Sequence, residues 1–213
     1  MIYRNYIKRL IDIVGAVVGI ILFFPLMVGV SIYIKVVSPD GPVLADIPNR
    51  IGKDKKPFKF YKFRSMYPNA HEMLKKDPEL YAKYIKNNYK LHTDEDPRLI
   101  KGGKFLRKSS IDEFPQFFNV LKGDMSLVGY RAYYFDEIEE QTKRYPESKK
   151  YIEKIMTVKP GITGLWQVSG RSDIGFVDRV KLDAKYAENV SLMYDLRIIL
   201  KTPYVVLLGK GAI

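Results

Sequence analysis

An uncharged, strongly apolar segment at residues 13–34 constrains the fold more than any other feature of this sequence. The hydrocarbon core of a bilayer needs about 20 apolar residues in a helix, so the segment is long enough to cross it. It is too long for a removable secretory signal and lacks a convincing small-residue cleavage site. The simplest prediction is therefore a single transmembrane helix.

Two features favour a different path for this helix. Pro25 lies near the middle of the segment, where it removes a helical hydrogen bond and crowds the preceding turn, so a kink is expected. Basic residues also cluster on both flanks, which suits a helix that enters one leaflet, bends and returns to the same side. These residues include Arg4, Lys8, Arg9, Lys35, Arg50, Lys53, Lys55 and Lys56. The residues alone leave a spanning and a re-entrant helix open.

Composition narrows the classes of function. The 213 residues predict one domain with a sizeable core, and the formal charge of +12 predicts an anionic partner such as nucleic acid, anionic lipid or a phosphorylated substrate. The absence of cysteine excludes disulfides, thiolate zinc sites and a Cys nucleophile. With only two histidines, a multi-His metal centre is nearly excluded as well. Any catalysis must therefore use carboxylates, hydroxyls or amines.

The segment after the apolar helix changes its periodicity. Residues 43–47 and 58–66 predict two extended segments around a Gly- and Lys-rich turn at 52–56. Alternation places Lys62 and Arg64 on one face, where two cations can hold a phosphate or simply protect an edge strand. Residues 69–88 then predict a helical scaffold region, interrupted near Pro78.

Asp112 and Glu113 form the most informative acidic pair. Pro115 is compatible with a helix that begins close to Asp112, because first-turn amides have no partner within a helix. The pair would then lie at the positive end of the helix dipole. However, Ser110 and Glu113 also fit a capping box, and acidic residues are common in first turns. The pair by itself is weak evidence for catalysis.

The surroundings of this pair point to phosphate chemistry. Arg107, Lys108 and Arg131 supply cations that can hold a phosphate, while the two carboxylates can hold a divalent cation. A carboxylate can attack phosphorus to give an acyl phosphate, and Mg²⁺ would neutralise the phosphate oxygens that repel it. From the residues alone, the sequence predicts a candidate phosphoryl-transfer site.

The C-terminal part, from residue 176 onward, predicts amphipathic helices interrupted at Pro203. Basic side chains flank their apolar faces: Lys181, Lys185, Arg197 and Lys201. Such helices suit the surface of an anionic membrane. Ordinary core helices with a solvated basic face are the alternative.

Short motifs run in a fixed order through nearly the whole chain. They are Lys8-Arg9-x-x-Asp12, Arg50-Ile51-Gly52, Lys62-Phe63-Arg64-Ser65-Met66, Asp96-Pro97-Arg98, FLRK at 105–108, DEFPQ at 112–116, NVLKGDMSLVG at 119–129, KPGITGLWQV at 159–168 and Gly170-Arg171. Each is modest, but their order and spacing together are specific. In these motifs the chain resembles the bacterial sugar transferases that act on polyprenyl phosphate, the monotopic phosphoglycosyl transferases.

The resemblance implies a reaction and a set of site residues. Such enzymes move a sugar-1-phosphate from a UDP-sugar to undecaprenyl phosphate and release UMP. By similarity, Asp112 is the nucleophile that forms a covalent phosphosugar intermediate, and both Asp112 and Glu113 bind Mg²⁺. The substrate-binding residues that we expect are Lys62, Arg64, Arg107, Arg131, Thr163, Gln167 and Arg171.

The resemblance also implies an α+β, mainly helical architecture with a short β-hairpin. Residues 1–38 would form a re-entrant membrane helix hairpin. As a separate hypothesis from the residues themselves, Asp12 pairs with Arg9 or Lys8 at the break. Residues 39–213 would form a cytoplasmic catalytic domain with interfacial amphipathic helices, on the inner membrane and in contact with its lipids. Because larger relatives carry an N-terminal multi-span region, we expect a minimal catalytic form or an excised domain. The sugar and the oligomeric state are left open.

Two departures from the family pattern stand out. Phe24 precedes Pro25 where Ser is common, and Tyr130 and Ala132 replace two prolines that usually flank the residue at Arg131. We expect Tyr130 and the single tryptophan, Trp166, to pack in the core. A membrane-anchored basic scaffold and a nucleic-acid-binding protein are the competing functions. The second lacks any recognisable nucleic-acid-binding motif, so no nucleic-acid partner is expected.

Overall fold

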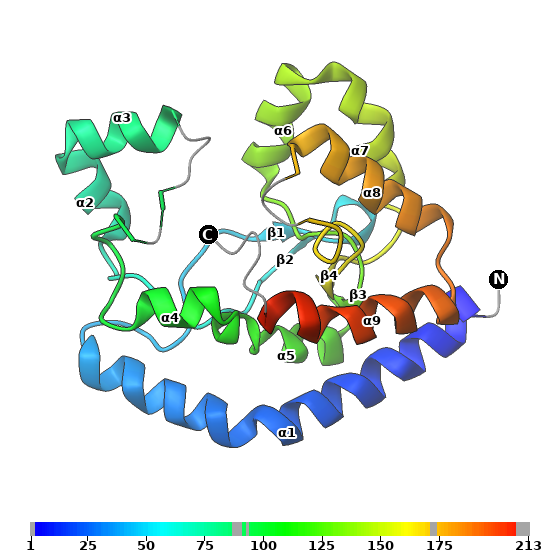
Figure 1. The fold of residues 1–213 in the computed structure, drawn as a ribbon, viewed down its shortest axis with the longest axis horizontal. Helices are drawn as coiled ribbons and strands as arrows, with labels where there is room; N and C mark the ends of the chain where they lie inside the picture. The colour runs from blue at the N-terminus through cyan, green and yellow to red at the C-terminus, as the bar shows by residue number, and fades with distance from the viewer. Residues whose placement is uncertain (1–2, 87–90, 93, 171–173, 208–213) are drawn as a thin grey trace.

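The computed structural model describes residues 3–86, 91–92, 94–170 and 174–207. They form a mainly helical molecule with small sheets, and one long N-terminal helix underlies the rest (Figure 1). In chain order the elements are η1 (Tyr3–Ile7, a π-helix), α1 (Lys8–Val37), β1 (Arg50–Ile51), η2 (Lys53–Lys55), β2 (Pro57–Phe58), α2 (Ala70–Lys76), α3 (Pro78–Lys86), α4 (Gly103–Lys108), η3 (Ile111–Glu113), α5 (Gln116–Lys122), β3 (Ser126–Val128), α6 (Phe135–Arg144), η4 (Pro146–Ser148), α7 (Lys149–Ile155), β4 (Gly161–Thr163), α8 (Phe176–Glu188) and α9 (Leu192–Leu207).

Helix α1 is continuous through Pro25 and is bent like a bow, with both ends curving towards the rest of the molecule (Figure 1). It is long and apolar enough to cross a membrane. Its outer face is exposed along the whole length, at residues that include Leu10, Val14, Val18, Ile21, Leu22, Phe24, Ile32 and Val36. The helix therefore presents an apolar surface that no other described part of the chain covers.

Two glycines on the inner face of α1 allow neighbouring elements to pack closely against the helix. A side-chain Cβ at Gly19 would lie 2.6 Å from the ring of Phe117 in α5, and one at Gly15 would lie 2.4 Å from Leu127 in β3. Because glycine has no side chain at these positions, α5 and β3 lie directly against the helix backbone.

Asp12 attaches the same face to β3. Its Oδ1 accepts hydrogen bonds from the Ser126 hydroxyl at 2.8 Å and from the Leu127 amide at 2.9 Å. Asp12 does not form the expected ion pair with Arg9 or Lys8. The basic residues reach other elements instead, so Asp12 connects α1 to the domain rather than stabilising a break within the helix.

Both basic side chains also connect α1 to the domain. Arg9 donates to the carbonyl oxygens of Val120 and Leu121 at 2.6 and 2.8 Å, close to the C-terminal end of α5, where a cation is favourable. Lys8 forms an ion pair with Asp195 of α9 at 2.7 Å. The N-terminal half of α1 is thus fixed by polar contacts to three different elements.

The predicted hairpin forms, but its first strand, β1, lies after the predicted segment 43–47, and β2 includes only the start of the segment 58–66. β1 and β2 are antiparallel, with Arg50 opposite Phe58 and an additional bridge between Leu44 and Phe63. A second, parallel sheet joins β3 to β4, which the sequence analysis did not predict. A Cβ at Gly161 would lie 2.0 Å from the Gly129 amide nitrogen, so this close strand contact requires glycine.

The helical predictions hold except at Pro203 and around the acidic pair. Helix α9 continues through Pro203, so the predicted interruption there is wrong. Helix α2 ends at Lys76 and helix α3 begins at Pro78, so the helical region is interrupted where the sequence indicates. Ser110, however, has a left-handed φ of 57° and makes no capping bond, so the predicted capping box is wrong. Asp112 lies in the short 3₁₀ turn η3, and α5 begins only at Gln116.

The main core packs α7 and α8 against the segment after β3. Tyr130 and Tyr133 are fully buried there, with Ile155 and Val180. The Tyr130 hydroxyl donates to the carbonyl oxygen of Ile51 at 3.1 Å, which links this core to β1. Tyr130 is a core residue, as predicted, and Trp166 is also buried.

Candidate active site

The site is built around Asp112, whose side chain is almost completely buried, with 1% of the residue exposed. Turn η3 is held against the neighbouring extended segment, because the Phe63 amide donates to the Asp112 carbonyl oxygen at 2.8 Å. This register places Lys62 directly beside the carboxylate, with its Nζ 2.7 Å from Asp112 Oδ2 and 3.7 Å from Glu113 Oε1. One cation therefore lies between the two acids of the predicted pair.

The pKa of the Asp112 carboxyl depends on burial and on the charges of three neighbouring side chains. Burial raises the pKa of the carboxyl, because the charged form loses its hydration. Lys62 lowers the pKa, Glu113 raises it, and Arg107 lowers it again. The net direction is upward, so the ionised carboxylate is a poorly solvated group with higher proton affinity than an ordinary aspartate.

Arg107 supplies a cation on the α4 side of the site. Its Nε donates to the Ser65 hydroxyl at 3.0 Å, which fixes the guanidinium next to the Lys62 segment. Burial lowers the pKa of Arg107, while Asp112 and Asp96 oppose that shift. A guanidinium remains charged at neutral pH even so, and its remaining donors suit the oxygens of a phosphate.

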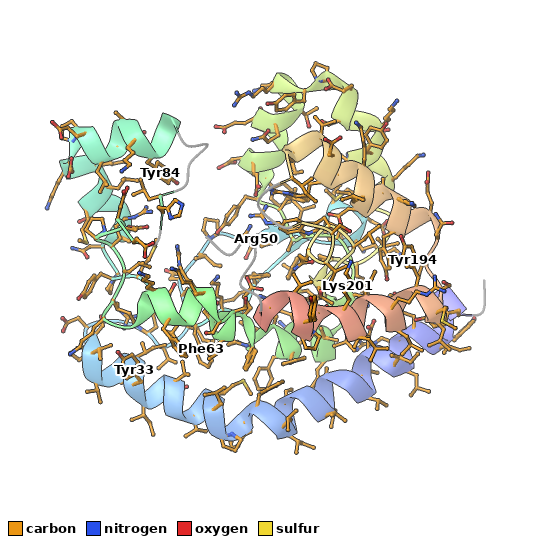
Figure 2. All side chains as sticks on the ribbon, viewed as in Figure 1. Tyr33, Arg50, Phe63, Tyr84, Tyr194 and Lys201 are labelled. Carbon is orange, nitrogen blue, oxygen red and sulfur yellow. The ribbon has the colours of Figure 1, made fainter. Side chains whose placement is uncertain are left out.

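Arg50 and Arg131 approach the site from the β1 side. Arg131 pairs with Glu137 at 2.6 Å; burial lowers its pKa, but Glu137 foremost and also Glu113 raise it, for a net increase. Arg50 lies in the middle of the molecule (Figure 2), with its guanidinium 3.2 Å from the centre of the Tyr134 ring.

Arg50 is the site residue that the sequence analysis did not single out. Burial lowers its pKa to about 10, and its Nε has no hydrogen-bond partner among the described residues. It interacts electrostatically with Glu113 and Arg131, which places it near the acidic pair. The Arg50-Ile51-Gly52 motif was the available signal, but the electrostatic interaction of Arg50 with Glu113 arises only through the tertiary fold.

Other predicted substrate contacts are used within the protein. The Arg64 guanidinium donates to the Ser38 hydroxyl and carbonyl oxygen at 2.8 and 2.6 Å and to the Pro42 carbonyl oxygen at 2.6 Å. Because Ser38 caps α1, Arg64 stabilises the C-terminal end of this helix. Lys62 and Arg64 do not act as a pair: only Lys62 lies beside the carboxylates.

Thr163 and Gln167 lie on the β4 side. The hydroxyl of Thr163 is 2.8 Å from that of Thr202 in α9, and Gln167 donates to the carbonyl oxygen of Ile162 at 3.0 Å. The first contact joins β4 to α9, and the second stabilises the turn that follows β4. The prediction for Arg171 falls outside the described residues.

The acidic pair has a donor set that suits Mg²⁺ only together with a phosphate. Lys62 Nζ contacts both carboxylates, which shows that a single cation can approach Asp112 and Glu113 at once. Within the described ranges no group of three or more His, Cys, Asp or Glu side chains is placed to hold a metal ion. Protein-bound Mg²⁺ commonly uses one or two carboxylates, several waters and substrate phosphate oxygens, so the pair fits this ion.

Taken together, the arrangement suits attack by a carboxylate on phosphorus. A buried carboxylate with a raised pKa contacts Lys62 and interacts electrostatically with Arg107, and both cations can bind phosphate oxygens. Glu113 is partly exposed at the same place, where it can bind a cation brought with the substrate.

Comparison with known proteins identifies close relatives over almost the entire chain. A model of the bacterial sugar transferase family matches residues 3–209. The chain is 44% identical to the undecaprenyl-phosphate galactose phosphotransferase of Salmonella typhimurium over 98% of this chain and 42% of that protein. It is 45% identical to the galactosyl transferase CpsE of Streptococcus agalactiae serotype III, over 96% of this chain and 43% of that protein.

A shorter relative is matched over most of its own length. The exopolysaccharide production protein ExoY of Rhizobium meliloti is 36% identical, over 96% of this chain and 87% of that protein. The chain thus spans about two fifths of the first two relatives and most of the third.

Proposed function

The chain belongs to the bacterial sugar transferase family, and we propose that it transfers a sugar-1-phosphate from a UDP-sugar to undecaprenyl phosphate, releasing UMP. The observation that carries this proposal is the buried Asp112 carboxylate in contact with Lys62 and adjacent to Glu113. The name of the Salmonella relative, an undecaprenyl-phosphate galactose phosphotransferase, supports the choice of acceptor. A product of this kind would begin the synthesis of a cell-surface glycan.

In the first step, an oxygen of the Asp112 carboxylate attacks the phosphorus that carries the sugar. The bond from that phosphorus to the oxygen bridging the two phosphates breaks, and UMP leaves with the bond electrons. An aspartyl phosphosugar remains on the enzyme. Desolvation makes the ionised carboxylate more reactive, because few hydrogen bonds need to be broken before it attacks.

In the second step, a phosphate oxygen of undecaprenyl phosphate attacks the same phosphorus. The acyl phosphate bond breaks and restores the Asp112 carboxylate, so the sum is a lipid diphosphate sugar plus UMP. The two steps require UMP to leave before the lipid phosphate attacks. The enzyme should therefore exchange its substrates in turn at one site.

The cations and Glu113 have distinct roles in this scheme. Lys62 and Arg107 bind oxygens of the transferring phosphate, and Arg50 and Arg131 orient the nucleotide diphosphate from the β1 side. Glu113 and Asp112 would hold Mg²⁺. When bound, that ion neutralises phosphate charge that would otherwise repel the carboxylate.

The exposed apolar surface of α1 supports the proposed membrane arrangement. In this arrangement residues 1–38, which include helix α1, enter the inner membrane from the cytoplasm, bend at Pro25 and return. Residues 39–213 stay in the cytoplasm. Both ends of the bow curve towards the domain, which supports this path (Figure 1). A stripe of exposed apolar side chains on α9 supports contact of that helix with the membrane surface: Leu192, Leu196, Leu200 and Tyr204.

The direct test is release of UMP from a panel of UDP-sugars, with Mg²⁺ and undecaprenyl phosphate. The panel should include UDP-galactose, because two relatives carry galactose in their names. We expect one UDP-sugar to support turnover and Asp112→Asn to abolish it. The absence of UMP release with every sugar would favour a scaffold role, and full activity in Asp112→Asn would refute the nucleophile.

A further inference from the structure

An apolar groove of about 770 Å³ lies between the second half of α1 and α5. Its α1 wall includes Phe24 and Val28, next to Pro25, and Phe118 contributes from α5. The opposite wall is formed by Leu44 and Phe63, and Figure 2 shows Phe63 between α1 and the α4–α5 segment. This volume is within the range of about 300–1,000 Å³ found for ligand pockets.

The groove adjoins the candidate nucleophile. Phe63, in its wall, donates its backbone amide to the Asp112 carbonyl oxygen at 2.8 Å. Pro115, which directly follows the η3 turn and Phe114, is also part of the lining. A molecule lying in the groove can therefore extend from the exposed side of α1 to the residues that carry the reacting carboxylate.

Lys122 is the one charged residue among those that line the groove. Lys122 Nζ donates to the Tyr61 hydroxyl at 3.3 Å, and Tyr61 directly precedes Lys62 in the chain. The groove thus combines an apolar surface with one cation, Lys122. Lys62 lies outside the lining and contacts Asp112. This distribution matches an amphiphile with a long hydrocarbon chain and an anionic head.

We propose that the groove binds the first isoprenoid units of the polyprenyl phosphate acceptor and directs its phosphate towards Asp112. This inference rests on the proposed function, since it assigns a place to the second substrate of that reaction. A lipid acceptor must keep its chain in the bilayer while its phosphate reaches the buried carboxylate. Of the described surfaces, this groove joins the exposed apolar face of α1 to the η3 turn.

The inference predicts that filling the groove weakens binding of the acceptor alone. Val28→Trp and Leu44→Trp fill it from opposite walls, and both native side chains are partly exposed, so the larger ring can be accommodated. The matched control is Val18→Trp, because Val18 lies on the exposed face of α1 and is not in the lining. All three proteins are measured in nanodiscs with undecaprenyl phosphate at varied mole fraction.

We expect both groove variants to raise the KM for undecaprenyl phosphate about tenfold. Their kcat/KM for the UDP-sugar and the initial burst of UMP without acceptor should not change, since the first step needs no lipid. Equal acceptor KM values in Val28→Trp, Leu44→Trp and Val18→Trp, with the burst intact, would overturn the groove assignment alone. Loss of the burst in the unmodified protein would instead refute the proposed function.

A competition experiment distinguishes the isoprenoid chain from any lipid chain. Dioleoyl phosphatidic acid carries a phosphate and two acyl chains, and we expect its weak inhibition to be the same in Val28→Trp and in the unmodified protein. If Val28→Trp relieves that inhibition to the extent that it raises the acceptor KM, the groove accepts acyl chains without selection. That result would contradict the assignment to an isoprenoid.

Discussion

At the scale of single residues, the protonation of Asp112 depends on a balance between burial and Lys62. Burial raises the pKa of the carboxyl, and the ammonium group 2.7 Å away opposes that rise. Only the ionised carboxylate can attack phosphorus, so activity should fall as the pH drops through the raised pKa. Lys62 then has a second role besides binding phosphate, because it keeps the nucleophile ionised near neutral pH.

The change Lys62→Met tests this role. Removing the cation lets the pKa of Asp112 rise further, so the acidic limb of the kcat/KM profile for the UDP-sugar should move to higher pH. An opposite charge at this distance typically shifts a carboxyl pKa by about 1–3 units, which sets the expected displacement.

Lys108→Met is the matched control, because Lys108 contacts Asp94 on the surface rather than the site. The control should leave the limb in place. A Lys62→Met profile that is lower in rate but unchanged in its pH dependence would mean that Lys62 only binds substrate.

The residue types were readable from the sequence, but their partners were not. Asp112 and Glu113 could be predicted because the motif around them is specific. The alternation that grouped Lys62 with Arg64 did not predict that one faces the carboxylates and the other Ser38. Those partners are 50 and 26 positions away, and only the packing of α1 and η3 determines them.

At the scale of elements, the attachment of α1 to the domain depends on glycine. Phe117 packs directly on the backbone at Gly19, whereas a Cβ at Gly29 would have no atom from other described parts of the chain within 4 Å. Both glycines are in one helix, and both look equivalent in the sequence. The difference comes from the neighbouring element, so α1 has a packed part and an open part.

Gly19→Leu should therefore destabilise the protein. The added side chain must displace Phe117 and separate α1 from α5, and overpacking of this kind costs about 1–3 kcal/mol. Thermal unfolding in detergent should show a lower Tm.

Gly29→Leu is the matched control for the helix itself. Leucine favours helix over glycine by about 0.5–1 kcal/mol and meets no obstacle at this position, so the Tm should stay the same or rise slightly. Equal losses of Tm in the two variants would show that the α1–α5 contact is not as close as described.

Element boundaries show where sequence reasoning stops. The breaks at Pro78 and the hairpin turn at 52–56 are local, so composition predicts them. The parallel pairing of β3 with β4 depends on the close approach of Gly129 to Gly161, which lie far apart in the chain. Likewise, the acidic pair looked like the first turn of a helix, but Ser110 takes a left-handed conformation that delays α5 until Gln116.

At the scale of the whole molecule, both ends of α1 should face the same compartment if the helix is re-entrant. The protein contains no cysteine, so a single introduced thiol reports its own accessibility. Tyr6→Cys and Asp40→Cys place thiols at exposed positions before and after the helix. Glu147→Cys, on the exposed surface of the domain, marks the cytoplasmic side.

We expect an impermeant maleimide to label all three variants in inverted membrane vesicles and none in intact cells. The basic residues on both flanks favour retention of both ends in the cytoplasm. Labelling of Tyr6→Cys and Asp40→Cys from opposite sides would show a spanning helix.

The most direct test of the whole account is the intact mass of the protein after mixing with its UDP-sugar in the absence of lipid acceptor. We predict a mass increase equal to one sugar phosphate, its disappearance when undecaprenyl phosphate is added, and no increase in Asp112→Asn. Turnover to the lipid product without any such adduct, under conditions in which an acyl phosphate survives, would contradict the central role of Asp112.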